Sequence, residues 1–186
     1  MQKVILASES PRRRELLASL NMNFMTCSPK VEEIFDLSLP IEEAVQKVAL
    51  TKALGGQKNY PQDVIVGADT IVVIDHQILG KPKDEEEAKN MLATLSGRTH
   101  DVYTGVAIVH QDQCETFYER TEVTFYELDS MTIDTYLATK EYKDKAGSYG
   151  IQGRGCILVK KINGDYYNVV GLPLASLQRH LSKYMK

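Results

Sequence analysis

The sequence contains no tryptophan, few cysteines and no long apolar run. Its three cysteines, Cys27, Cys114 and Cys156, lie far apart and form no CxxC pair. An odd number of scattered cysteines is not typical of a disulfide framework or a zinc site, so we expect reduced thiols and a cytoplasmic protein. Because the first apolar run is short and arginines follow it, we expect neither a secretory signal nor a transmembrane helix, and no membrane partner.

An excess of positive charge is also missing, since 22 lysines and arginines face 25 aspartates and glutamates. A general nucleic-acid binder is usually basic, so we expect no nucleic-acid partner, and any anion site must be a local concentration of cations. The chain is long enough for one sizeable core and shows no linker, low-complexity tract or internal repeat. Residues 1–186 are therefore predicted to form a single domain.

Three familiar functional motifs are absent as well. The chain has no GxxxxGKS/T element, no GxGxxG after its first strand and no GxSxG elbow. The first absence excludes a P-loop NTPase, and the second removes the usual dinucleotide-binding fingerprint. Acyl transfer is unsupported, because there is no nucleophile elbow and no Cys/His arrangement with a persuasive context.

A strand-to-helix junction near the start of the chain concentrates positive charge. Val4–Ala7 is apolar and strand-like, and Ser10 followed by Pro11 is typical of a helix start. Residues 12–14 are all arginines, which is unfavourable at a helix N-terminus unless an anion lies nearby. Exposed N–H groups, hydroxyls and guanidinium groups together form a cradle suited to phosphates. The alternative is that the arginines point to solvent or pair with the neighbouring glutamates.

A helical pattern further along the chain contains one lysine that is out of place. Apolar residues recur at helical spacing from Ile41, and Gly55–Gly56 is expected to end this helix. Lys52 falls at the edge of the apolar face. That position requires either a snorkelling stem or an anion to meet the ammonium group.

One acidic residue interrupts the most hydrophobic stretch of the sequence. Residues 63–75 have the nearly continuous apolar character of a buried central strand, and Asp69 lies in their middle. A buried carboxylate needs a hydrogen bond, a cation or a metal, and the nearby Gly67 permits a close backbone approach or a kink. Asp69 is therefore either a structural turn residue or a catalytic or metal-binding one.

The rest of the pattern predicts further helices and strands. Helices are expected after the capping residues Asp84 and Asp129 and from Pro173 onward. The predicted strands form two hairpins, the first His100–His110 with Cys114–Leu128 and the second Cys156–Ile162 with Tyr166–Val170. The polar, glycine-rich segment Lys143–Gly155 is typical of a functional loop.

Several polar residues are not explained by a purely structural role. They are Ser8, Ser10, the arginines at 12–14, Glu33, Lys52, Asp69, Lys81, Asp144, Lys145 and Gln152. The cations suit a polyphosphate, whereas the carboxylates suit a divalent ion and a base that activates water. The residues therefore favour hydrolytic phosphoryl or nucleotidyl transfer, and they leave open which phosphate is attacked.

Short motifs follow one another along nearly the whole chain. They are Ser8–Arg13 (SESPRR), Gly67–Thr70 (GADT), Gly80–Pro82 (GKP), Ser96–His100 (SGRTH), Asp144–Gly147 (DKAG), Tyr149–Gly153 (YGIQG), Gly164–Tyr166 (GDY) and Gly171–Pro173 (GLP). In this order they resemble the Maf family of nucleoside triphosphate pyrophosphatases. Any one motif would be weak, but the ordered set is highly specific.

The resemblance implies an α/β fold like that of the inosine-triphosphate pyrophosphatases, with an elongated, mixed and twisted sheet, flanking helices and two lobes around a central nucleotide cleft. It implies hydrolysis of a nucleoside triphosphate to the monophosphate and pyrophosphate. The implied cofactor is a divalent metal cation, Mg²⁺ or alternatively Mn²⁺ or Co²⁺, and the implied assembly is a homodimer. The alternative function is a nucleotide-binding regulator that inhibits septum formation in cell division.

The resemblance also assigns roles to individual residues. On the family pattern Asp69 accepts the proton of the attacking water, and Glu33 holds the metal or positions the water, so both are implied metal ligands. The implied triphosphate contacts are Ser8, Arg13, Lys52 and Lys81, the last also counted with the catalytic residues. These roles agree with the chemistry of the side chains, because fixed cations and a metal stabilise charge on phosphate oxygens.

Three positions resemble the dTTP- and UTP-preferring subgroup of the family, namely Arg12, Thr70 and Gln152. The subgroup that acts on 7-methyl-GTP typically carries a tryptophan, a glutamine and a glutamate there. An aromatic ring suits a cationic purine, whereas an amide suits a pyrimidine edge that offers both a donor and an acceptor. The resemblance therefore implies a house-cleaning enzyme for dTTP, UTP and modified pyrimidine triphosphates.

Overall fold

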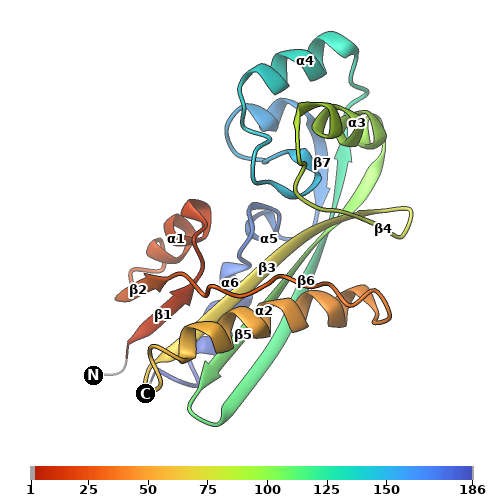
Figure 1. Cartoon of the computed structure of the whole chain (residues 1–186). Helices are drawn as coiled ribbons and strands as arrows, with labels where there is room; N and C mark the ends of the chain where they lie inside the picture. Colours follow the sequence, from red (N-terminus) through yellow and green to blue (C-terminus); the bar gives the residue numbers. More distant parts are fainter. Residues whose placement is uncertain (1–2, 186) are drawn as a thin grey trace. The chain divides into compact units, whose positions relative to one another are not determined.

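The structure of the protein is a computed structural model in which residues 3–185 are described. Helices and strands are interspersed along the chain (Figure 1). In chain order they are β1 (Val4–Ala7), α1 (Pro11–Ala18), β2 (Phe24–Cys27), α2 (Ile41–Gln57), β3 (Val64–Ile74), β4 (Gln77–Leu79), α3 (Glu85–Leu95), β5 (Thr99–His110), β6 (Gln113–Phe125), α4 (Ser130–Ala138), the 3₁₀ turns η1 (Ala146–Ser148) and η2 (Gly153–Ile157), β7 (Val159–Asn163), α5 (Tyr166–Val170) and α6 (Leu174–Leu181).

The strands of the described residues form one seven-stranded mixed sheet. Its order is β2-β1-β3-β5-β6-β7, and β4 pairs with β3. β1 runs parallel to β2 and β3, in a register that places Val4 opposite Phe24 and Val64. β4 is antiparallel to β3, and β7 is antiparallel to β6. The predicted α/β class, a mixed sheet flanked by helices, is confirmed.

The described chain divides into two compact units, each built from separate stretches. The first unit takes the chain up to Thr70, then Thr104–Glu119, then Gly171 onward. The second unit takes Ile71–Tyr103 and Arg120–Val170. Three of the four boundaries fall inside β3, β5 and β6, so these strands contribute residues to both units, and the fourth lies directly after α5. The single domain over residues 1–186 and the nucleotide cleft stay predictions.

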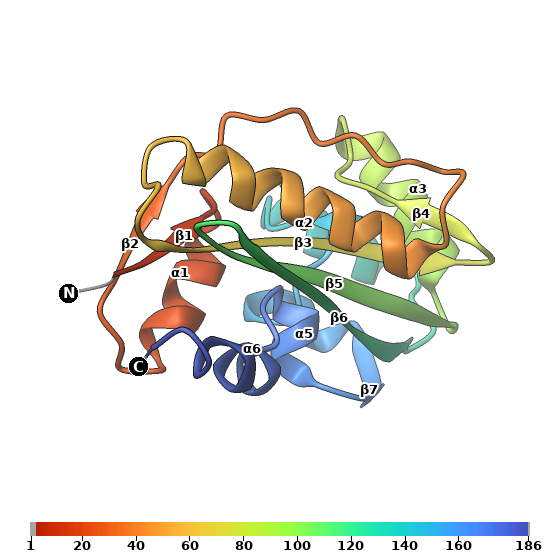
Figure 2. The same cartoon turned by 90° about the horizontal axis from the view of Figure 1, so that it is seen from below.

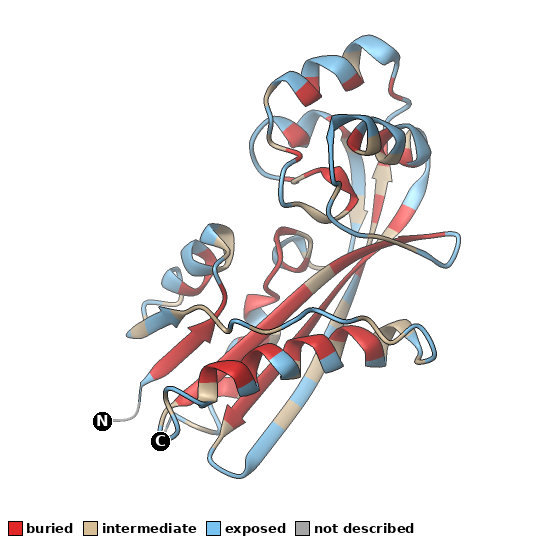
Figure 3. Cartoon of the chain, in the orientation of Figure 1, coloured by how far each residue is buried: buried red, intermediate tan, exposed pale blue. Residues whose placement is uncertain are grey.

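In the first unit, helices cover both faces of the sheet. Figure 2 shows α2 on one face and α1 and α6 on the other. The core against α2 is made of small and branched side chains, among them Ile5, Ala7, Ala49, Ala53 and Ile65. Buried residues line one side of α2, and exposed residues line the other (Figure 3). This packing places Lys52, a residue of the buried side, against the sheet.

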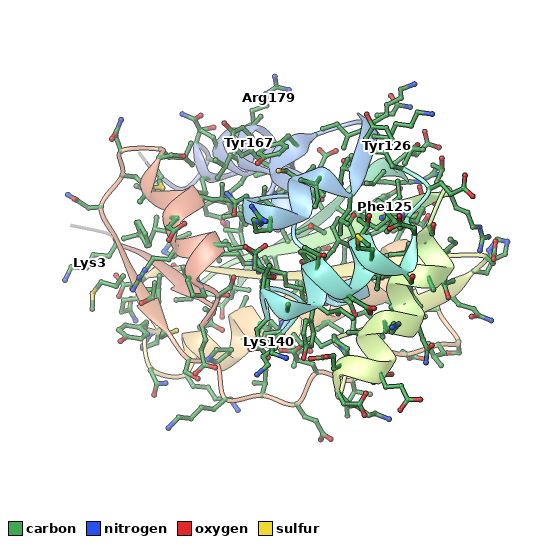
Figure 4. All side chains as sticks on the ribbon, turned by 90° about the horizontal axis from the view of Figure 1, so that it is seen from above. Lys3, Phe125, Tyr126, Lys140, Tyr167 and Arg179 are labelled. Atoms are coloured by element: carbon green, nitrogen blue, oxygen red, sulfur yellow. The ribbon has the colours of Figure 1, made fainter. Side chains whose placement is uncertain are left out.

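The core of the second unit gathers aromatic rings around a buried histidine. His100, Phe125 and Tyr149 are 2%, 1% and 6% exposed, and Figure 4 labels Phe125. Their rings meet edge-on, with centroids 4.7 to 5.4 Å apart. His100 Nε2 lies 2.8 Å from the Tyr149 hydroxyl oxygen. Burial lowers the pKa of His100 to about 4 and raises the pKa of Tyr149, so both side chains are neutral at neutral pH.

Three predicted helix starts are confirmed by their capping contacts. The side chains of Ser10, Asp84 and Asp129 each accept a hydrogen bond from the backbone N–H three residues further on, at 3.5, 2.8 and 2.7 Å. Such contacts satisfy backbone donors that have no partner inside the helix. The last predicted helix also begins as expected, with Pro173 directly before α6.

The predicted end of the second helix at Gly55–Gly56 is wrong, because α2 continues to Gln57. A Cβ on Gly55 would lie 2.6 Å from Val31 Cγ1, and a Cβ on Gly56 would lie 3.0 Å from Ala7 Cβ. These glycines therefore allow close packing of the helix against its neighbours. They do not terminate it, because neither adopts the left-handed backbone conformation of a helix end.

The predicted strand Tyr166–Val170 is also wrong, since these residues form the short helix α5. Asp165 Oδ1 accepts a hydrogen bond from the backbone N–H of Tyr167 at 2.8 Å, which turns the chain. The buried Asn168 side chain then donates to Thr121 Oγ1 at 2.9 Å. The strand prediction relied on aromatic and β-branched residues, and these specific hydrogen bonds override that propensity.

The glycine-rich segment is only partly irregular, because it contains η1 and the start of η2. The strand predicted from Cys156 begins later, at Val159, because η2 extends to Ile157. No helix within residues 3–185 combines the length and the apolar character that crossing a membrane requires. Cys27, Cys114 and Cys156 are free thiols, as expected from their spacing.

Candidate active site

A buried ion pair lies among the polar side chains of the first unit. Asp69 on β3 and Lys52 on α2 are each 6% exposed, and Lys52 Nζ lies 2.6 Å from Asp69 Oδ1. The same ammonium group lies 2.9 Å from Glu33 Oε1. Glu33 belongs to the segment between β2 and α2, and its side chain is 42% exposed. Lys52 therefore joins two carboxylates that come from different parts of the sequence.

A glycine on β3 explains how Lys52 reaches Asp69. A Cβ on Gly67 would lie 2.3 Å from the Ala49 carbonyl oxygen and 2.7 Å from the Ala53 backbone nitrogen. The backbones of α2 and β3 are thus in direct contact, which only glycine permits. Since residues two apart in a strand share a face, Asp69 points to the same helix as Gly67. Of the two roles predicted for Gly67, a close backbone approach or a kink, the close approach is confirmed.

Arg13, in the first turn of α1, is held by two acceptors. Its Nε donates to the Gly171 carbonyl at 2.8 Å, and its Nη2 donates to Thr70 Oγ1 at 3.0 Å. Burial lowers the pKa of Arg13, whereas the negative charges of Asp69 and Glu33 raise it. The guanidinium stays charged, because the ordinary arginine value is far above neutral pH. Arg13 is therefore a fixed cation near the two carboxylates.

The rest of the strand-to-helix junction forms a small polar turn. The Oγ of Ser8, which is 8% exposed, accepts a hydrogen bond from the Ser10 backbone N–H at 3.2 Å. Arg12 is half-buried and Arg14 is exposed. The first turn of α1 contains no acidic residue, so the negative charge near it comes from the carboxylates described above. These carboxylates offset the unfavourable placement of Arg13 at a helix N-terminus, whereas Arg14 is exposed.

The predicted site residues are divided between the two units. Those in the first unit are Ser8, Arg12, Arg13, Glu33, Lys52, Asp69 and Thr70. Lys81 and Gln152 belong to the second unit, and both are exposed. Their participation in one site with Asp69 stays a prediction.

Within the second unit, the segment that carries Lys81 is tied to the glycine-rich loop. The Gly147 backbone N–H donates to the Gly80 carbonyl at 3.1 Å. Gly147 has φ +65, and a Cβ there would lie 2.9 Å from Val72 Cγ2. A glycine is therefore required where the loop passes over β3, and it fixes the loop beside the residue that precedes Lys81.

The carboxylates on Lys52 also indicate where a divalent cation would bind. Mg²⁺ at nucleotide sites is usually held by one or two carboxylates together with substrate phosphates and water. Asp69 and Glu33 both direct an oxygen at the Lys52 ammonium group, so this donor pair already faces one cation. Within residues 3–185, no group of three or more His, Cys, Asp or Glu side chains is arranged to hold a metal. Asp69 and Glu33 are therefore the residues that could hold such an ion, with phosphate and water oxygens as its other ligands.

Two residues beside Arg13 were not assigned a role from the sequence. Thr104 on β5 is 0% exposed, and its Oγ1 lies 2.9 Å from Thr70 Oγ1. Gly171 provides the carbonyl that accepts from Arg13 Nε. The available signals were a threonine in a strand and a glycine before Leu-Pro, and neither pattern specifies a partner on another element.

Comparisons with known proteins identify the family. The family model described as Maf-like protein matches residues 3–184. A dTTP/UTP pyrophosphatase of Bacillus cytotoxicus is 54% identical over 184 residues, which cover 99% of this chain and 96% of that protein. Proteins of the same name from Bacillus cereus and Bacillus mycoides are each 53% identical with the same coverage.

Among solved structures, a Vibrio cholerae protein aligns with a TM-score of 0.35 and 14% identity, over 76% of this chain and 69% of that one. The family model and the relatives, by contrast, cover almost the whole chain, and the residues that the family model matches include all those of the candidate site. The chain therefore belongs to the Maf-like protein family.

Proposed function

We propose that this chain hydrolyses dTTP and UTP to the nucleoside monophosphate and pyrophosphate. Relatives that are 53 to 54% identical along almost the whole chain are named dTTP/UTP pyrophosphatases. The observation that carries the proposal is the cluster of Asp69, Lys52 and Glu33 near Arg13. It combines a buried acid with fixed cations, which is the chemistry that phosphoanhydride hydrolysis requires.

Asp69 would accept the proton of the attacking water. Because Lys52 holds Oδ1 of this carboxylate, the direction of the base is fixed before substrate arrives. The water oxygen forms a bond to the α-phosphorus while the bond to the bridging oxygen breaks, and pyrophosphate leaves with that oxygen. When bound, a divalent cation held by Asp69 and Glu33 would neutralise charge on the phosphate oxygens.

The cations of the first unit would bind the triphosphate. Arg13 has a planar guanidinium that suits phosphate oxygens. An ammonium group has three donors, and two of those on Lys52 meet carboxylates, so the third would serve a phosphate oxygen. The buried Ser8 hydroxyl and Lys81 would complete these contacts. Base preference would depend on Arg12, Thr70 and Gln152.

A nucleotide panel tests this proposal. Purified protein is incubated with dTTP, UTP, CTP, GTP and 7-methyl-GTP in the presence of Mg²⁺, and the products are separated. We expect pyrophosphate and monophosphate from dTTP and UTP, with much slower release from the purine nucleotides. Orthophosphate as the primary product, or equal rates on 7-methyl-GTP, would contradict the proposal.

Three finer assignments accompany this function. We take Mg²⁺ as the working cation, with Mn²⁺ or Co²⁺ as substitutes, because all the expected ligands are oxygen atoms. We place the protein in the cytoplasm, because its thiols are free, and we take a homodimer as its assembly. Chelation of divalent ions should stop pyrophosphate release until Mg²⁺ is returned. For the homodimer, sedimentation should give twice the 20.9 kDa mass of one chain.

A further inference from the structure

Four residues of the first unit form a hydrogen-bond network that ends at Arg13. Arg13 donates from Nε to the Gly171 carbonyl at 2.8 Å and from Nη2 to Thr70 Oγ1 at 3.0 Å. Thr70 Oγ1 lies 2.9 Å from Thr104 Oγ1 and 3.5 Å from the Gly171 carbonyl oxygen. Thr104 is completely buried, whereas Thr70 is half-buried.

The direction of these hydrogen bonds follows from the groups involved. A guanidinium has donors only, so Thr70 must offer a lone pair to Arg13. The Thr70 proton is then directed to Thr104 at 2.9 Å or to Gly171 at 3.5 Å. Because a hydrogen bond is weak at the longer distance, the bond with Thr104 is the stronger of the two, and either hydroxyl can donate in it. In either direction, this short contact restrains the Thr70 hydroxyl, whose oxygen accepts from Arg13.

Gly171 holds the other side of the same guanidinium. Its φ is +128, a conformation that residues with a side chain rarely adopt, and a Cβ there would lie 3.7 Å from Arg13 Nε. The carbonyl orientation that Nε requires is thus available to glycine. Since two of the five guanidinium donors are engaged by the described residues, three are left for an anion.

We propose that Thr104 is a positioning residue of the phosphate site. Its hydroxyl orients Thr70, and Thr70 together with Gly171 fixes the plane of the Arg13 guanidinium for the triphosphate. Thr104 does not touch the substrate, because its side chain is completely buried. The inference rests on the proposed function, in which Arg13 binds phosphate. It gives Thr70 a second task beside the choice of base.

Two substitutions at one position test this role. Thr104→Val keeps the shape and removes the hydroxyl, whereas Thr104→Ser keeps the hydroxyl. The measurements are the Kd of inorganic tripolyphosphate by calorimetry and the KM and kcat for dTTP. We expect Thr104→Val to raise Kd and KM roughly three- to tenfold, the effect of one hydrogen bond, with a smaller change in kcat. Thr104→Ser should stay within about twofold of the wild type, because the hydroxyl is retained.

Thr121 provides a matched control from the second unit. It is also 0% exposed, and its hydroxyl bonds to Asn168 and Asp165. Thr121→Val should lower the melting temperature and leave the tripolyphosphate Kd unchanged.

If Thr104→Val does not fold, Thr104→Ala removes the same hydroxyl with less crowding and is compared with Thr104→Ser in the same way.

An Arg13→Lys background separates positioning from general destabilisation. Lysine lacks the planar fork that Thr70 holds, so Thr104→Val should cause no further rise in Kd there. A wild-type Kd in Thr104→Val, or a full additional rise in the Arg13→Lys background, would overturn the inference. A wild-type protein that releases no pyrophosphate from dTTP refutes the proposed function instead, while the tripolyphosphate measurements still decide the role of Thr104.

Discussion

Lys52 meets two carboxylates, so the loss of either carboxylate charge still leaves the ammonium group with one partner. If Asp69 becomes neutral, the ammonium group retains Glu33 at 2.9 Å. If Lys52 is removed, two acids remain near each other without the cation between them, which is the costlier change for a buried group. Substitution of Asp69 is therefore the cleaner way to separate chemistry from folding.

We expect Asp69→Asn to lower kcat for dTTP by about 10²- to 10⁴-fold, the usual contribution of a general base. The asparagine keeps an oxygen that can accept from Lys52, so stability should change by only about 1 kcal/mol. Steady-state kinetics and denaturant unfolding measure the two effects. The control is Asp75→Asn, an exposed acid after β3, which should keep full activity. Unchanged turnover in Asp69→Asn would remove Asp69 from the mechanism.

His100 should make stability depend on pH in the weakly acidic range. Its pKa is lowered by burial from 6.5 to about 4, so the unfolded chain binds the proton more readily than the folded chain. Stability is therefore fully present above about pH 6.5 and falls as the pH is lowered towards 4, by about 3 kcal/mol in total. Unfolding free energy measured between pH 4 and 7 should show this slope.

His100→Gln isolates that contribution, because glutamine can still hydrogen-bond the Tyr149 hydroxyl and does not titrate. The difference between the wild type and the variant should shrink steadily below pH 6.5. A difference that stays constant over the whole range would show that His100 is not the group responsible.

At the scale of elements, the packing of α2 against the sheet determines the position of Lys52. Gly67→Ala places a Cβ 2.3 Å from the Ala49 carbonyl oxygen, a backbone atom that cannot rotate away. We expect a loss of about 1 to 3 kcal/mol from overpacking, together with reduced turnover because the helix that carries Lys52 is displaced. Gly80→Ala is the stability control, since a Cβ there meets nothing within 4 Å. Equal stability of the two variants would contradict the close contact between α2 and β3 at Gly67.

The sequence was most informative where a local signal determines the structure. Ser10, Asp84 and Asp129 cap helices through neighbouring backbone groups, so their roles are contained in a few consecutive residues. Asp69 was conspicuous because a carboxylate interrupts an apolar strand. The short helix α5 was missed because it depends on a buried contact between Asn168 and Thr121, which are distant in sequence.

The same limit applies to the candidate site. Lys52 and Asp69 could be selected as exceptions to an apolar pattern, but their pairing depends on how α2 packs against β3. Thr104 could not be selected, since threonine is common in strands and only its neighbours distinguish it. The family resemblance supplied roles for Glu33 and Gln152 that no local pattern would have given.

At the scale of the whole molecule, each unit is assembled from separated stretches, so neither can be obtained by one cut. A fragment that ends at Tyr103 lacks the later parts of both units. We expect it to show no cooperative thermal transition by circular dichroism, while the full chain shows one, because neither core can be completed. A sharp transition in the fragment would mean that an early stretch folds by itself.

The three residues around Arg13 also mark the path of the chain. Thr70 is the last residue of one stretch of the first unit, and Thr104 and Gly171 each begin another. The chain leaves or re-enters that unit at four places, and the hydrogen bonds of Arg13 and its network link three of them. An anion bound to Arg13 would act as a reversible cross-link between these crossings. Saturation with tripolyphosphate should consequently slow the exchange of backbone amide hydrogens near Thr70, Thr104 and Gly171 more than in the rest of the sheet.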